Sequence, residues 1–202
     1  MIKAIIFDFG RVISAQKPPS LFHSYEDELG LVPGTINSIM FDSEAWQDAL
    51  VGRKTVEEFW HEIGPELGLH SANEVDAFRY LYRADEEINQ GALDLILRLH
   101  GNYKLAVLSN SPIGLTQWLA DWNVLNFFDV VFCSGDEGIA KPDPKAFELT
   151  LERLRVKPNE AVFIDDTRGH VEAAQKLGLQ GILFTTAEDL EDELDLLLRK
   201  DF

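Results

Sequence analysis

The first clear pattern along the chain is an unbroken apolar run at residues 4–7, Ala-Ile-Ile-Phe. The run is too short for an ordinary helix and is rich in β-branched and aromatic side chains. It predicts a strand that is buried on both faces, as in the middle of a parallel sheet. From residue 15 to residue 84 no strand-like run follows, and proline-containing pairs separate helical patterns. This stretch is therefore predicted to be a small all-helical insert.

Beyond residue 85, short apolar runs alternate regularly with amphipathic segments. The expected strands are residues 104–108, 130–133, 161–164 and 182–184, and the expected helices are residues 92–99, 112–122, 144–154, 167–177 and 187–199. Strands and helices that alternate at this spacing form a parallel sheet with right-handed crossover connections. The sequence therefore predicts an α/β fold, with a helix-flanked parallel sheet in residues 1–14 and 85–202 and the helical insert in residues 15–84.

The composition narrows the range of partners and compartments. The 202 residues carry a formal net charge of −17, which disfavours nucleic acid and anionic membrane surfaces as partners because both are negatively charged. Cys133 is the only cysteine, so an internal disulfide is excluded, which suits a reducing compartment. The sequence shows neither a secretory leader nor an apolar run of membrane-spanning length, so we expect a cytoplasmic protein. Monomer and dimer are both compatible with the sequence.

Polar side chains stand where three of the predicted strands end. Asp8 follows the first strand, Ser109-Asn110 the second and Asp165-Asp166 the fourth. A further charge, Lys141, stands just before the predicted helix at residues 144–154. Each of these residues alone is more often a helix cap or a surface charge than a catalyst. Because open α/β sheets place their chemistry beyond the carboxyl ends of the strands, we expect all of them to meet in one crevice.

The residue types at these positions favour phosphoryl transfer. Three carboxylates in one crevice repel one another unless a cation neutralises them, and a hard cation such as Mg²⁺ takes oxygen ligands and can bridge to a phosphate. Lys141 supplies a second positive charge, and the Ser109 hydroxyl with nearby backbone N–H groups can bind anionic oxygens. A carboxylate nucleophile, a metal ion, a lysine and a hydroxyl are the parts needed for a reaction through an aspartyl-phosphate.

These segments, in this order, resemble the motifs of the haloacid dehalogenase superfamily, and the helical insert resembles its C1-type cap. The most specific matches are Ser134-x-Asp136-x-Gly138-x-x-Lys141-Pro142-Asp143-Pro144 and Phe163-Ile164-Asp165-Asp166. The resemblance covers essentially the whole chain. It implies a Rossmann-like core under a mobile cap, here residues 15–84.

The resemblance also implies a role for each motif residue. Asp8 would be the nucleophile and a metal ligand, and the Gly10 carbonyl and Asp166 would complete the Mg²⁺ site, with Asp165 in support. Ser109 would hold the phosphoryl group, with Asn110 beside it, and Lys141 would neutralise its charge. Two positions depart from the usual pattern: Gly10 replaces the aspartate that serves as acid and base, and His170 replaces an asparagine or aspartate. An Asp-x-Gly-x-Val branch that resembles sugar-1-phosphate phosphatases and the neighbours of epoxide hydrolase N-terminal domains has the same glycine.

Arg11 and the aromatic residues of the insert each allow two interpretations. Arg11 either contacts a substrate phosphate or sugar, or pairs with an acid and covers the site. The aromatic residues either line a substrate pocket or form the core of the cap, and the second is the more common arrangement. The aromatic residues in question are Phe41, Trp46, Phe59 and Trp60. Arg53 and Lys54, in an expected loop, are better candidates for contacts with a charged substrate.

Three functions follow from these residues. We expect a Mg²⁺-dependent phosphatase that acts on a small phosphorylated metabolite, with sugar phosphates among the candidates, and that is slow or atypical because Gly10 replaces the general acid. One alternative is a 2-haloacid dehalogenase, because a halide leaving group needs no proton; the pair Asp165-Asp166 argues against it. The other alternative is a non-catalytic binding or regulatory protein that keeps the fold.

Overall fold

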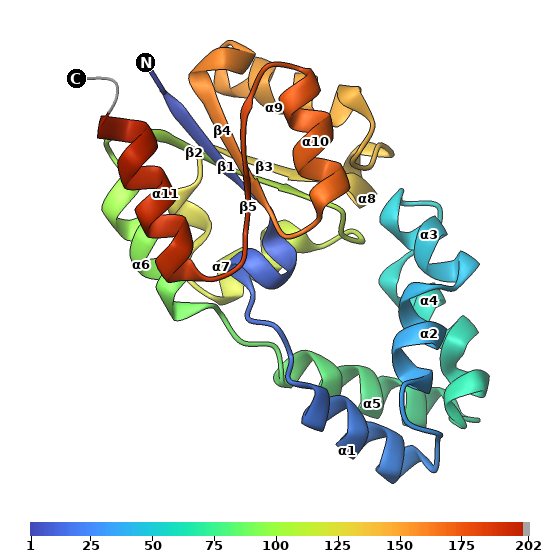
Figure 1. The fold of residues 1–202 in the computed structure, drawn as a ribbon. Helices are drawn as coiled ribbons and strands as arrows, with labels where there is room; N and C mark the ends of the chain where they lie inside the picture. The colour runs from blue at the N-terminus through green and yellow to red at the C-terminus, as the bar shows by residue number, and fades with distance from the viewer. Residues whose placement is uncertain (200–202) are drawn as a thin grey trace.

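The computed structural model describes residues 1–199 and contains a sheet of five parallel strands (Figure 1). The order of the strands across the sheet is β3-β2-β1-β4-β5. Their bounds are β1 (Ala4–Phe7), β2 (Lys104–Ser109), β3 (Val130–Cys133), β4 (Ala161–Asp165) and β5 (Gln180–Leu183). The first strand of the chain is thus the central one, and all four of its residues are buried. The predicted α/β class and parallel sheet are confirmed.

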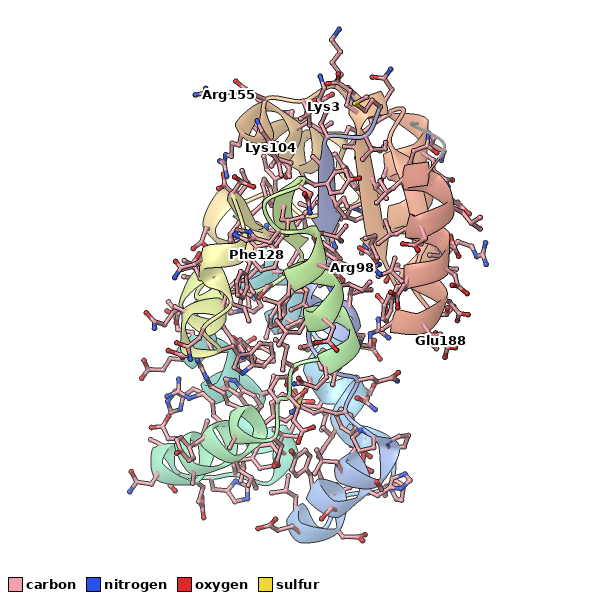
Figure 2. All side chains as sticks on the ribbon, turned by 90° about the vertical axis from the view of Figure 1, so that its left-hand side faces the viewer. Lys3, Arg98, Lys104, Phe128, Arg155 and Glu188 are labelled. Carbon is pink, nitrogen blue, oxygen red and sulfur yellow. The ribbon has the colours of Figure 1, made fainter. Side chains whose placement is uncertain are left out.

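Helices cover both faces of the sheet, and each face has its own apolar cluster. On one face lie α6 (Gln90–Leu99), α7 (Leu115–Asp121) and α11 (Ala187–Arg199); on the other lie α9 (Pro144–Leu154) and α10 (Arg168–Lys176). Alternate strand residues face opposite clusters: Ile5 packs with the first set of helices and Ile6 with the second. Figure 2 labels Arg98 on α6, next to α11. Its guanidinium forms ion pairs with Glu191 and Asp195 of α11.

Five helices lie within residues 15–84 and share a third apolar cluster. They are α1 (Pro19–Leu29), α2 (Thr35–Phe41), α3 (Glu44–Leu50), α4 (Val56–Ile63) and α5 (Ala72–Ala84). Phe59 and Trp60 are buried in this cluster, and Phe41 and Trp46 pack against it. These four rings therefore belong to the core of the insert, as the second interpretation expected. We propose the boundaries at residues 14/15 and 84/85 for this unit, which we call the cap.

Two chain segments connect the cap to the sheet, and they are paired with each other. Ser14 and Ile88 form an antiparallel bridge, and the Ala15 N–H donates to the Glu87 carbonyl at 2.8 Å. Lys17, whose side chain is buried, pairs with Glu86 at 2.8 Å. The cap thus leaves and rejoins the core at one place.

A second cap–core contact lies at the far side of the cap, where α3 approaches the short helix α8 (Ser134–Glu137) (Figure 1). Gly52 follows α3 with φ +70°, and a Cβ at this position would overlap the Gly135 carbonyl oxygen. Glycine is needed here both for the left-handed backbone and for the close approach. The neighbouring Arg53 and Lys54 both pair with Asp48, at 2.7 and 3.2 Å, so their charges are engaged within the cap.

Several elements begin or end one to three residues away from the expected positions, among them β5 and α7. β5 runs from Gln180 to Leu183 rather than over residues 182–184, because its register on β4 pairs Val162 with Gln180 and Asp165 with Leu183. α7 begins only at Leu115, after Gly114 with φ +113°. Among the described residues, no helix has both the length and the apolar character needed to cross a membrane.

Candidate active site

The register of the sheet brings the polar strand ends together. Phe7 lies opposite Ile164, and the Asp8 N–H donates to the Ile164 carbonyl at 2.8 Å, so Asp8 stands beside Asp165. Ser109 is the last residue of β2, on the other side of β1, and is buried. All these positions are at the carboxyl edge of the sheet, where the strand-end pattern placed them.

Lys141 joins two of these carboxylates. Its ammonium group lies 2.8 Å from Asp8 Oδ1 and 2.6 Å from Asp165 Oδ2, and its side chain is 1% exposed. A buried charge is stable only when it is paired and hydrogen-bonded. Here one ammonium group serves two carboxylates from adjacent strands, so its position fixes their separation.

The pKa values in this trio follow from burial and from the opposed charges. Burial raises the pKa of Asp8, and the attraction of Lys141 only partly offsets this. Burial alone would lower the pKa of Lys141, but Asp8 and Asp165 together hold it above its ordinary value. For Asp165 the effect of burial is overcome by hydrogen bonding from His170 and by Lys141, and its pKa is lowered. The lysine is therefore firmly protonated.

The side chain of Asn110 positions Lys141 by binding the backbone of that lysine. The amide oxygen of Asn110 accepts from the Lys141 N–H at 2.7 Å, and its NH₂ group donates to the Lys141 carbonyl at 2.8 Å. Both ends of the amide are thus used to bind the lysine loop. The family resemblance implied that Asn110 lies beside the phosphoryl group. Its two hydrogen bonds to the backbone of Lys141 could not be predicted from the residue pattern.

Asp165 is held by three donors. Its carboxylate accepts from Lys141, from the Thr167 N–H at 2.7 Å and from His170 Nδ1 at 3.1 Å. His170 thus forms the kind of hydrogen bond that an asparagine at this position could supply. Both carboxylate oxygens of Asp165 are therefore engaged by protein donors.

Asp166 faces the open side of the site and pairs with Arg11. The Arg11 guanidinium lies 2.7 Å from Asp166 Oδ2, and the Thr167 hydroxyl donates to Asp166 Oδ1 at 3.2 Å. Of the two interpretations of Arg11, contact with substrate or pairing with an acid, the structure shows the pairing. Asp8, Asp165 and Asp166 each offer a carboxylate oxygen, and these atoms lie within 4.8 Å of one another.

Gly10 has room for a side chain. Its φ is −65° and its ψ is 124°, which any residue can adopt, and a Cβ built on it meets nothing within 4 Å. The backbone therefore does not require glycine at this position. The missing aspartate of the usual motif is a change of chemistry and not of conformation.

The haloacid dehalogenase-like hydrolase family matches residues 2–178. The chain belongs to this family. The parallel sheet flanked by helices agrees with this family, and the candidate residues of the site lie at the carboxyl ends of β1, β2 and β4 and in the loop before α9.

Several known proteins that are similar to this hydrolase align with nearly its whole length. D-ribitol-5-phosphate phosphatase from Bacteroides thetaiotaomicron is 26% identical over 206 residues, 98% of this chain and 99% of that protein. Acyl-CoA dehydrogenase family member 10 from Mus musculus is 29% identical over 97% of this chain, which spans only 19% of that protein. A haloacid dehalogenase family enzyme from Bacteroides thetaiotaomicron, solved with magnesium and inorganic phosphate, is 24% identical with a TM-score of 0.73 and covers 92% of this chain and 96% of its own. This last likeness shows the fold.

Proposed function

We propose that this hydrolase is a Mg²⁺-dependent phosphatase of small phosphorylated metabolites, with sugar phosphates as the first candidates, and that it works through an aspartyl-phosphate on Asp8. The observation that carries the proposal is Lys141, buried between Asp8 and Asp165 with Asp166 beside them. A dehalogenase would need the nucleophile but not three clustered carboxylates.

The donor set fits a magnesium ion. Three carboxylates supply hard oxygen ligands, and Mg²⁺ is commonly held through one or two carboxylates together with substrate phosphate. Asp8 and Asp166, with the Gly10 carbonyl, would hold the ion, and Asp165 would orient them. When bound, the ion neutralises phosphate oxygens and so lets an anionic nucleophile approach an anionic ester.

The residues of the chain then perform two displacements. An Asp8 carboxylate oxygen attacks phosphorus, and the bond from phosphorus to the ester oxygen breaks. The leaving group departs as an alkoxide and takes its proton from water, because Gly10 supplies none. Ser109 donates a hydrogen bond to a phosphoryl oxygen, and Lys141 holds the charge that develops there. Water then attacks the phosphorus of the aspartyl-phosphate, which releases inorganic phosphate and restores the Asp8 carboxylate.

Release of phosphate from a panel of phosphate esters in the presence of Mg²⁺ tests the proposal. We expect turnover of at least one sugar phosphate, and we expect Asp8→Asn to abolish it. Asp192→Asn, which alters an exposed acid of α11 on the surface of the core, is the matched control and should keep full activity. Absence of turnover, or turnover unchanged by Asp8→Asn, contradicts the proposal.

The two alternative functions give different results. Gly10 is compatible with a dehalogenase because a halide leaving group needs no proton. A dehalogenase would release chloride from a 2-chloro acid in the presence of EDTA. A non-catalytic protein predicts that Mg²⁺ with beryllofluoride leaves the melting temperature unchanged. A phosphatase predicts a rise that depends on Asp8, because a ligand that binds only the folded state stabilises it.

A further inference from the structure

Arg11 engages the most accessible carboxylate of the cluster. The exposed fraction of the side chain is 16% for Asp166, 11% for Asp8 and 0% for Asp165. Asp165 accepts from Lys141, Thr167 and His170, whereas Asp166 Oδ2 is paired with a guanidinium from the surface. A cation that binds Asp166 Oδ2 therefore competes with Arg11.

The backbone of Arg11 is fixed while its side chain is accessible. The residue has φ +60°, its N–H donates to Ser14 Oγ at 3.1 Å, and the Ser14 N–H donates to the Phe9 carbonyl at 2.8 Å. Its side chain is 58% exposed. A long side chain on a fixed turn can exchange one anionic partner for another without moving the main chain.

We propose that Arg11 is an exchangeable counter-ion, which a divalent cation must displace from Asp166 and which is thereby released to bind an anionic group of the substrate. The inference rests on the proposed function for its metal ion and adds a role for Arg11. The Arg11 guanidinium already lies 2.7 Å from Asp166 Oδ2, so a divalent cation bound to the same carboxylate would lie beside a second positive charge. Metal binding and the Arg11–Asp166 pair therefore compete for this carboxylate.

The charges of the site support displacement. Asp8, Asp165 and Asp166 carry three negative charges, and Lys141 and Arg11 carry two positive charges. A divalent cation turns the formal sum from −1 to +1, so the bound ion and Arg11 repel each other. Of the two protein cations, Lys141 is buried and held by two carboxylates, whereas Arg11 is held by one and half-exposed. Arg11 is the one that leaves.

The expected change in Mg²⁺ affinity corresponds to the loss of one partly exposed ion pair, Arg11–Asp166. Such pairs are worth up to about 1 kcal/mol, or roughly fivefold in an equilibrium constant, and the repulsion in the loaded site adds to this. We therefore expect removal of the Arg11 charge to tighten metal binding by about three- to tenfold. The apparent affinity rises because the binding-competent fraction of the site rises.

The test is calorimetric titration of the intact chain with Mg²⁺ alone, without substrate. Arg11→Asn removes the charge and suits the left-handed backbone, and we expect it to bind Mg²⁺ three- to tenfold more tightly than the original chain. Arg11→Lys retains the charge and should stay within about twofold of the original value. Arg53→Asn is the matched control, because Arg53 also pairs with one aspartate at 2.7 Å and is similarly exposed, but lies in the cap; it should change nothing.

Equal or weaker binding by Arg11→Asn overturns the inference. So does an equal gain in the Arg53→Asn variant, since the effect would then be one of net charge. If no variant binds Mg²⁺ while esters are hydrolysed in EDTA, the inference fails and the phosphatase proposal loses only its metal. If Arg11→Asn binds more tightly and no ester is hydrolysed, displacement of Arg11 by the cation stands, whereas the proposed function fails together with the contact between Arg11 and substrate.

Discussion

At the scale of single residues, Lys141 is the charge on which the site depends. Removal of one partner from a buried ion pair leaves the other charge unpaired and costs about 3–5 kcal/mol. Lys141→Met keeps most of the volume of the side chain and leaves Asp8 and Asp165 facing each other. We expect a loss of about that size in the free energy of unfolding, measured by urea denaturation at pH 7.

The matched control for that loss is Arg153→Met. Arg153 forms a two-pronged pair with Glu137, at 2.7 Å for both bonds, but on the surface, where such pairs contribute about 0–1 kcal/mol. A Lys141→Met variant that is no less stable than Arg153→Met would mean that the two buried carboxylates relax or take up protons at little cost.

Gly10→Asp is expected to restore the proton donor. The φ of −65° and the free space around a Cβ allow the aspartate without strain. A general acid contributes about 10²–10⁴-fold, and the gain should be greatest for alkyl phosphates, whose leaving oxygen most needs a proton. We expect p-nitrophenyl phosphate and sugar 1-phosphates to be cleaved faster than glycerol 3-phosphate by the original chain, and Gly10→Asp to narrow that difference.

Rates over a series of esters with graded leaving-group pKa measure this effect. Asn159→Asp, at an exposed position just before β4, controls for the added charge. A rate that does not depend on the leaving group in the original chain would show that another residue gives the proton or that the chemical step is not rate-limiting.

The sequence predicted which residues stand at the strand ends, because a parallel sheet brings its carboxyl ends together. It did not predict which side chain binds which. The Arg11–Asp166 ion pair and the hydrogen bonds between Asn110 and Lys141 depend on the path of loops that meet only in the folded chain. Local sequence carries no signal for contacts between residues 31 positions apart.

At the scale of elements, the capping box of α4 is expected to make the cap sensitive to acid. The Thr55 N–H and hydroxyl both donate to Glu58, at 2.8 and 2.9 Å, and these bonds lower the pKa of Glu58 from its ordinary 4.5. The stabilisation is therefore complete above pH 4.5 and is lost as the pH falls through the lowered value. Urea midpoints of the original chain and Glu58→Gln should differ at pH 7 and converge near pH 3.

Glu57→Gln serves as the neighbouring control, since Glu57 is exposed and lies 4.0 Å from His61. It changes the same charge in the same helical turn without the capping bonds. If the gap for Glu58→Gln is the same at pH 3 as at pH 7, the effect comes from packing and not from the ionised carboxylate.

The elements themselves were largely predictable, and the exceptions have physical reasons. Periodicity predicted β2, β3 and β4 within one residue, because buried strands are continuous apolar runs. The edge strand β5 was placed two residues late, since its start at the polar Gln180 is set by pairing with β4 and not by its own side chains. The short helix α8 was not predicted at all, because four residues carry no period.

At the scale of the whole molecule, the contact between Gly52 and Gly135 is expected to govern how the cap sits on the core. Gly52→Ala places a methyl group into the Gly135 carbonyl, so the two loops must separate. We expect faster hydrogen exchange at residues 51–54 and 134–138 and a raised KM for small esters. Gly30→Ala has the same backbone strain, at φ +69°, but meets nothing within 4 Å; it should lower stability without either effect.

The place of β1 has a consequence for how the chain is made. Ala4 pairs with Lys104 on one side and Ala161 on the other, so both of its neighbours are made long after it. At about 5–20 residues per second, its second neighbour emerges roughly 8–30 seconds later. In that interval the cap can fold on its own cluster and bring residues 14 and 88 together, which shortens the loop that β1 must close. Asp8 is thus synthesised well before Asp165, beside which it must stand.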